Sequence, residues 1–70
     1  MTEKITLEIN GEIRSVPPVS NLRELLVHLG IGEDRVAVEV NGSIARRREW
    51  ETTRIKDRDR IEIVQFVGGG

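Results

Sequence analysis

Apolar and polar residues alternate in segments that begin at Ile5, Val36 and Ile61, and this two-residue period is typical of strands with one buried face. The dipeptide Asn-Gly follows the first two segments directly, at positions 10–11 and 41–42. Asn-Gly suits a type I′ turn, whose two central residues both need positive φ. We therefore predict that residues 12–16 return as the second strand of a hairpin, and that residues 43–45 form a short edge strand.

A helical period replaces this alternation between positions 21 and 30. Asn21 can cap the first turn, with Glu24 three residues later as in a capping box, and Gly30 supplies a stop. His28 lies off the apolar face. That face is predicted to consist of four leucines, Leu22, Leu25, Leu26 and Leu29. The leucines need a sheet to cover them.

The remaining segments complete an α+β pattern. Residues 46–53 have no clear period, so their conformation is left open, with Trp50 as the one anchor, and residues 57–59 are typical of a tight turn. We predict one main helix packed on one face of a mixed sheet of four to five strands, a β-grasp-like domain over residues 1–67, with a flexible glycine tail at 68–70. Besides the leucines, the predicted core contains Ile5, Leu7, Val36, Val38, Ile61 and Ile63.

If Ile61 and Ile63 face the helix, Val64 and Phe66 point to the opposite face of the sheet. An apolar pair would then lie on a largely polar surface. Either the last strand tilts and this pair packs under a loop, or the pair is a small docking patch beside the tail.

Composition narrows the class of protein. The 70 residues allow one domain, and the absence of cysteine excludes disulfides and thiolate metal sites and suits a reducing compartment. The net charge of −1, with interspersed signs, argues against a nucleic-acid partner. The arginines at 46–48 are interpreted as a solvated loop face, with partner docking as their one functional use. With neither a membrane span nor a secretory signal expected, we predict a cytoplasmic protein that has no membrane partner.

The sequence contains few residues that could act as catalytic side chains. There is no cysteine or tyrosine and one histidine, so neither a His–Cys dyad nor a multi-histidine metal site can form. The serines at 15, 20 and 43 and the acids at 33–34, 57 and 59 fall at turns or strand ends, where such residues commonly bond local backbone. We therefore expect no catalytic residue and no metal site.

The chain ends in Gly68, Gly69 and Gly70, and because it opens with Met we expect this to be the natural end. A terminal carboxylate has a pKa of about 3.3–3.7 and is ionised at neutral pH, which makes it a poor electrophile. Activation as an acyl-adenylate would require the tail to enter an enzyme that binds ATP. Glycine keeps such a thread narrow and permits positive φ. The alternatives are a disordered end and a remnant of cloning.

Several segments together closely resemble the bacterial thiamine-biosynthesis sulfur carriers. The similarity runs across nearly the whole chain and is most specific in its final half. The residues that carry it are Asn41, Gly42, Ser43, Ile44, Arg47, Trp50, the run at 56–64, and the ending Phe66, Val67, Gly68, Gly69 and Gly70.

The resemblance implies a ubiquitin-like β-grasp domain whose terminal Gly70 is adenylated by an E1-like activating enzyme using ATP and magnesium. A sulfur donor such as a cysteine desulfurase then supplies the sulfur of a thiocarboxylate, which delivers it to thiazole synthase for the thiazole ring. The carrier itself binds no cofactor. Gly68 and Gly69 are the expected thread, and Val64, Phe66 and Val67 the expected docking residues.

Two positions depart from the family pattern, because Arg46 stands where proline is common and Arg58 where glycine is frequent. Related carriers for molybdopterin synthesis or for transfer-RNA thiolation also end in Gly-Gly. The approach at 64–68 contains no proline, which favours the thiamine type over the molybdopterin type. A β-grasp interaction module with inert glycines is the alternative from another class.

Overall fold

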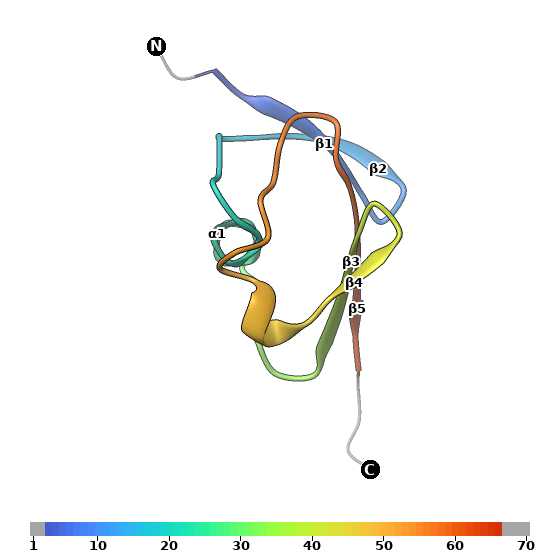
Figure 1. Cartoon of the computed structure of the whole chain (residues 1–70). Coiled ribbons are helices and arrows are strands. Elements are labelled where there is room, and N and C mark those ends of the chain that lie inside the picture. Colours follow the sequence, from blue (N-terminus) through green and yellow to red (C-terminus); the bar gives the residue numbers. More distant parts are fainter. Residues whose placement is uncertain (1–2, 67–70) are drawn as a thin grey trace.

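A five-stranded mixed sheet carries one α-helix on one of its faces in the computed structural model, which describes residues 3–66 (Figure 1). This arrangement confirms the predicted β-grasp fold. Val67 and the glycine tail lie outside the described residues. The elements are β1 (Ile5–Ile9), β2 (Glu12–Val16), α1 (Leu22–His28), β3 (Val36–Val40), β4 (Ser43–Ala45), the 3₁₀ turn η1 (Arg47–Glu49) and β5 (Arg60–Gln65).

The last strand of the chain occupies the middle of the sheet, whose order is β2-β1-β5-β3-β4. Strand β5 runs parallel to β1 and antiparallel to β3. Ile61 is paired with Ile9 on one side and with Val40 on the other. The hairpins β1–β2 and β3–β4 therefore flank β5, which is paired with β3 from Ile61 to Gln65 and with β1 at Arg60 and Ile61.

Both Asn-Gly turns adopt the positive φ values that the sequence predicts. The φ angles are 51° at Asn10 and 83° at Gly11, and 52° at Asn41 and 87° at Gly42. Asparagine tolerates the left-handed region better than most residues with a Cβ, and glycine has no Cβ to clash there. The predicted hairpin and the short edge strand β4 are confirmed.

The helix begins as predicted, with one change in its cap. The Asn21 Oδ1 accepts a hydrogen bond from the Glu24 amide at 2.9 Å. The Glu24 carboxylate accepts from the amide of Ser20 at 2.8 Å, one residue earlier than a standard capping box would place it. Gly30 follows the helix with a φ of 74°. None of the helices that the structure describes is long and apolar enough to span a membrane.

The core lies between α1 and the inner face of the sheet. Leu22, Leu25 and Leu26 are buried, whereas Leu29 is half-buried. Among the predicted strand residues, Ile5 and Val36 are also half-buried, and Leu7, Val38, Ile61 and Ile63 are buried as expected. The cluster also buries apolar residues that the predicted core did not include, namely Ile9, Val16, Ala45, Ile55 and Trp50, the last of which was expected as the anchor of its segment.

Residues 46–53, whose conformation the sequence left open, wrap around the Trp50 side chain. Trp50 is 1% exposed, and its Nε1 donates to the Ala45 carbonyl at 2.9 Å. The Arg46 amide donates to the Glu49 carboxylate at 2.9 Å and starts the turn η1. Trp50 thus anchors this segment, as predicted from its position as the one large apolar residue in a polar stretch.

The turn before β5 is tied to β1 and contains a residue in the left-handed region. Arg58 has a φ of 73°, and its amide donates to the Thr6 carbonyl at 2.6 Å. The Thr6 amide in turn donates to the Asp57 Oδ1 at 2.7 Å. Asp59 is buried. Its carboxylate accepts hydrogen bonds from the backbone amide of Lys56 and from the Asn41 Nδ2.

We expect Arg58→Gly to raise the free energy of unfolding by about 0.5–1 kcal/mol, because glycine adopts this φ without a Cβ clash. Arg60→Gly is the matched control. Arg60 is exposed within the extended strand β5, where glycine should destabilise by a similar amount. Urea unfolding of both variants measures the difference, and a loss of stability in Arg58→Gly would contradict the assignment of strain.

Candidate functional site

The two apolar residues near the end of β5 lie on the face of the sheet opposite α1, which we call the outer face. Ile61 and Ile63 are buried against the helix, so the alternation turns Val64 and Phe66 outward. Their side chains are 54% and 59% exposed. This agrees with the parity predicted from the sequence and excludes packing of this pair under a loop of the described chain.

Backbone hydrogen bonds follow the chain as far as Phe66. Gln65 is paired with Val36 at the end of the β3–β5 ladder, and the Phe66 amide donates to the Arg35 carbonyl at 2.8 Å. Arg35 has a φ of 61°, which places it in the left-handed region directly before β3. The strand is therefore held at a fixed position immediately before Val67. Val67, Gly68, Gly69 and Gly70, which the sequence nominates as docking and threading residues, lie outside the described residues.

The asparagine side chains of the two hairpin turns also bind β5. Strand β1 ends at Ile9, and the side-chain amide of Asn10 makes the next hydrogen bonds to β5. Its Oδ1 accepts from the Ile63 backbone amide at 2.7 Å, and its Nδ2 donates to the Ile63 carbonyl at 3.2 Å. On the other side, the Asn41 Oδ1 accepts from the Arg60 amide at 2.9 Å. Each turn thus positions the strand that leads to the chain end.

Two further apolar residues accompany Val64 and Phe66. Ala37 on β3 is the direct partner of Val64, and Ile44 on β4 is the partner of Glu39, two residues along β3. Ile44 is 70% exposed. We call Ala37, Ile44, Val64 and Phe66 the outer patch. Ile44 was not predicted on this face. A two-residue turn at Asn41 and Gly42 pairs residues 43–45 with residues 38–40, and this register puts Ile44 on the same face as Glu39.

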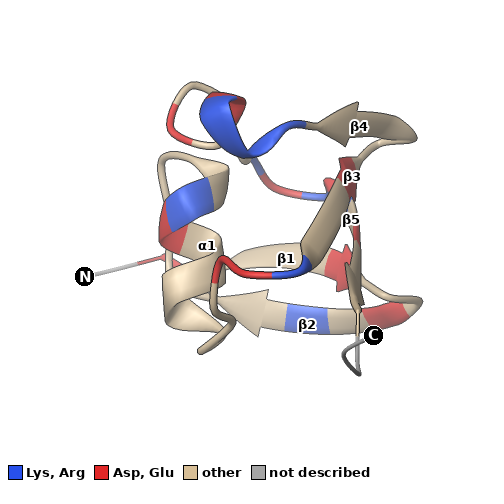
Figure 2. Ribbon diagram, turned by 90° about the horizontal axis from the view of Figure 1, so that it is seen from below, with Lys and Arg blue, Asp and Glu red and all other residues tan. Residues whose placement is uncertain are grey.

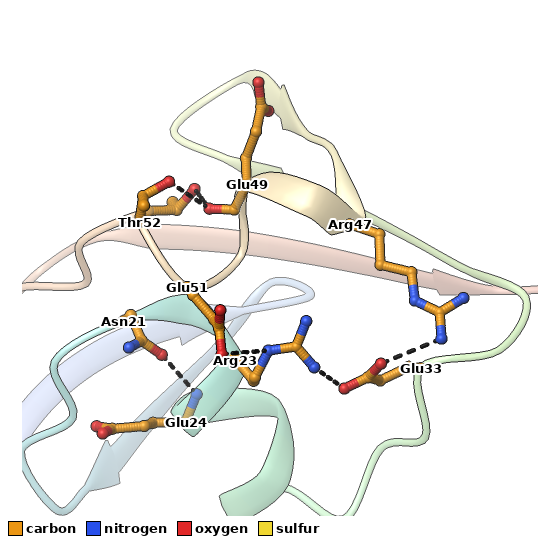
Figure 3. Close-up of polar contacts among 9 residues, drawn as sticks. Asn21, Arg23, Glu24, Glu33, Arg47, Glu49, Glu51 and Thr52 are labelled. Atoms are coloured by element: carbon orange, nitrogen blue, oxygen red, sulfur yellow. Dashed lines mark hydrogen bonds and ion pairs between the residues drawn. The ribbon is translucent and has the colours of Figure 1, made fainter.

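The helix side of the molecule carries a network of ion pairs instead (Figure 3). The Arg23 guanidinium binds the Glu33 carboxylate and lies 3.6 Å from the Glu51 carboxylate. Arg47 binds the other oxygen of Glu33 at 3.1 Å. The Arg23 guanidinium also lies over the Trp50 ring, 5.9 Å from its centroid. These contacts connect α1 to the loop before β3 and to η1.

This network gives the basic run at 46–48 a structural role in part, because Arg47 is paired with Glu33 and more distantly with Asp34. The run lies in the connection after β4 (Figure 2). An open depression of about 410 Å³ lies beside α1, and its lining includes Asn21, Val27 and His28. Arg23, Glu24 and Glu51 complete this lining, and Arg23 and Glu51 belong to the ion-pair network.

The remaining chemical candidates are separate from one another. Ser15 lies on the edge strand β2 and Ser43 on the opposite edge strand β4, whereas Ser20 precedes the helix. Asp57 and Asp59 bind backbone amides around the last turn. Across residues 3–66, no group of three or more histidine or acidic residues is placed to hold a metal ion.

Comparison with known proteins shows which family the chain resembles over its length. The model of the ThiS family matches residues 6–70. The sulfur carrier protein ThiS of Bacillus subtilis is 34% identical over 65 residues, which are 91% of this chain and 98% of that protein. The uncharacterized protein ycf40 of Porphyra purpurea is 34% identical over 70 residues, which are 100% of this chain and 99% of that protein.

A longer relative and a solved structure extend this comparison. The thiazole synthase of Paramagnetospirillum magneticum is 39% identical over 64 residues, but the matched segment is 20% of that protein. The crystal structure of the thiamine biosynthesis protein ThiS from Geobacter metallireducens superposes with a TM-score of 0.79 at 35% identity, covering 94% of this chain and 100% of that one.

We predict that Asn10→Gly lowers the free energy of unfolding by about 1–3 kcal/mol, because it keeps positive φ available but leaves the Ile63 amide and carbonyl without the Asn10 side chain. Asn10→Asp retains an acceptor for the Ile63 amide and should lose less. Chemical denaturation of both variants tests this order. Unchanged unfolding of Asn10→Gly would mean that the turn amide does not hold β5.

Proposed function

We infer that this chain, which belongs to the ThiS family, is a sulfur carrier protein of thiamine biosynthesis. One observation carries the inference: similarity to the Bacillus subtilis carrier and to the Geobacter metallireducens ThiS structure extends over nearly the full length of each protein. A carrier of this kind has to present one reactive group and a recognisable surface. The scarcity of catalytic side chains in the described domain is compatible with that role.

We propose that the reactive group is the carboxylate of Gly70. In the proposed reaction a carboxylate oxygen attacks the α-phosphate of ATP within an adenylating enzyme, and pyrophosphate leaves. A persulfide on a donor protein then displaces AMP from the acyl-adenylate and forms an acyl disulfide. A second thiol of the enzyme system cleaves this S–S bond, supplies the two electrons and ends in a disulfide, and the thiocarboxylate remains at the chain end. ATP and magnesium belong to the activating enzyme, and the carrier is a co-substrate that contributes no catalytic side chain.

Gly68 and Gly69 are proposed to form the thread that brings Gly70 to the adenylation site. A residue without Cβ passes through a narrow channel and adopts backbone conformations that other residues avoid. The central position of β5 supports this proposal, because two hairpins hold the strand from which the thread continues. The domain then acts as a rigid handle for a short reactive end.

Thiazole synthase is the proposed acceptor of the sulfur. In the Paramagnetospirillum magneticum protein of that name, and in its namesake from Magnetococcus marinus, a segment similar to this chain forms 20% of the polypeptide. Two domains on one chain meet at high effective concentration, which favours a shared reaction. The sulfur donor is proposed to be a cysteine desulfurase, and the site of action to be the cytoplasm, where ATP is available.

Deleting Gly70 should abolish sulfur loading without unfolding the domain. Intact protein incubated with its activating enzyme, ATP and a sulfur donor should gain the mass difference between one sulfur and one oxygen atom. The truncated chain should gain nothing, because its terminal carboxylate stops one residue short of the reactive position. Mass spectrometry measures both, and the melting temperature shows that the domain is intact.

The control for that experiment is the Bacillus subtilis carrier treated in the same way. If the control is loaded and the intact chain is not, the carrier function is wrong. The chain would then be a β-grasp interaction module whose glycines are inert.

We also propose that Val64, Phe66 and Val67 contact the partner enzymes beside the entry of the tail. Phe66→Ala should weaken binding to the activating enzyme about tenfold or more, since aromatic residues often dominate interface energies. Its effect on the melting temperature should be small, because Phe66 is 59% exposed. Ile13→Ala is the matched control: Ile13 is 71% exposed, but it lies on the edge strand β2.

Calorimetric titration and thermal unfolding of both variants test the docking assignment. A large loss of melting temperature in Phe66→Ala with unchanged affinity would assign Phe66 to the fold. Equal losses of affinity in Phe66→Ala and Ile13→Ala would move the docking surface away from the end of β5.

A further inference from the structure

Two glutamates face each other on the outer face, next to the outer patch. Glu39 on β3 and Glu62 on β5 are direct partners in the antiparallel register. Their neighbours Val38, Ile61 and Ile63 are buried on the helix side, so both carboxylates point to the outer face. Figure 2 shows acidic positions on both of these strands.

Such a pair is unfavourable in the free protein, because like charges directly opposite each other on neighbouring strands repel. No ion pair or hydrogen bond of the described residues engages either carboxylate. Arg60, which shares the outer face of β5, is the register partner of Glu8 on β1. The sheet therefore places one basic residue against Glu8 and none directly against the Glu39 and Glu62 pair.

Apolar side chains of the outer patch border this acidic pair. Ile44 is the partner of Glu39 across the β3–β4 hairpin, and Val64 follows Glu62 on the same face of β5. Lysine and arginine combine a charged head with an apolar stem, which matches carboxylates set beside exposed aliphatic groups. An arginine fork can in addition bind two carboxylates at once.

We propose that the outer patch and the Glu39–Glu62 pair form one docking surface, and that its occupant is a surface of the adenylating enzyme with an arginine or lysine among apolar residues. This inference rests on the proposed function and names the chemistry of the partner. An enzyme that binds ATP surrounds the phosphates with positive charge, so the surroundings of its tail entry are expected to be electropositive.

Docking would relieve the repulsion between the two carboxylates by placing a cation between them. Complementary charge also accelerates the encounter of two proteins and fixes their relative orientation. The carrier would thus retain a locally unfavourable pair in its free state because the pair guides recognition on the strand that leads to the chain end.

The test uses the full-length carrier and its activating enzyme. The double variant Glu39→Gln/Glu62→Gln removes both charges and keeps the side-chain shape, and Glu12→Gln removes one charge on the edge strand β2 as a control. We expect the double variant to unfold at the same or a higher urea concentration than the parent. Its affinity for the activating enzyme should fall about tenfold, and its association rate should depend less on salt.

Sulfur loading at saturating enzyme separates this inference from the proposed function. If the double variant is loaded and binds as tightly as the parent, the charge pair plays no part in docking, while the carrier function stands. Three other outcomes would overturn the adenylating enzyme as the occupant. The double variant could lose affinity for thiazole synthase alone, or change only in self-association. Glu12→Gln could also lose as much affinity for the activating enzyme as the double variant does. Failure of the parent itself to load sulfur would overturn the proposed function.

Discussion

The pairing of β5 between β1 and β3 is the interaction on which the rest of the structure depends. The last strand of the chain closes the sheet, because it alone joins the two hairpins, which lie on either side of it. Its inward residues Ile61 and Ile63 complete the core beneath α1, and the same alternation sends Glu62, Val64 and Phe66 to the outer face. Core formation and presentation of the chain end are therefore consequences of one strand register. A shift by one residue would exchange the two faces and remove both.

The register of β5 is set by more than its backbone ladder. Asn10 and Asn41 have the positive φ that their tight turns require, and each also uses its side-chain amide to bind the backbone of β5. In this way each hairpin turn fixes a strand that lies far away in the sequence. Asp59 adds a buried carboxylate that receives the Asn41 side chain and the Lys56 amide, so the turn entering β5 is fixed as well.

Local patterns in the sequence predicted most of the fold, and the exceptions share one physical cause. Alternation located β1, β3 and β5, Asn-Gly dipeptides located the hairpin turns, and the Asn21 cap located the helix, since each of these signals acts over a few residues. The burial of Trp50 and Ile55 depends on segments distant in the chain, so no period marks it. Ile44 was missed as a surface residue because its orientation follows from pairing with β3. The nomination of Gly70 came from the family resemblance and from the lack of other chemistry, and no local pattern assigns it a reaction.

The helix side of the molecule and the outer face of the sheet differ in how their charges are compensated, and the proposed docking surface rests on this difference. On the helix side, Arg23 and Arg47 both bind Glu33, and Glu51 lies 3.6 Å from Arg23, so opposite charges are paired across three segments. On the outer face, Glu39 and Glu62 oppose each other beside the exposed Ile44 and Val64. Stability alone would favour opposite charges at a directly paired position. The Glu39 and Glu62 pair has no such compensation among the described residues, and the proposed docking of a complementary surface on another protein accounts for it.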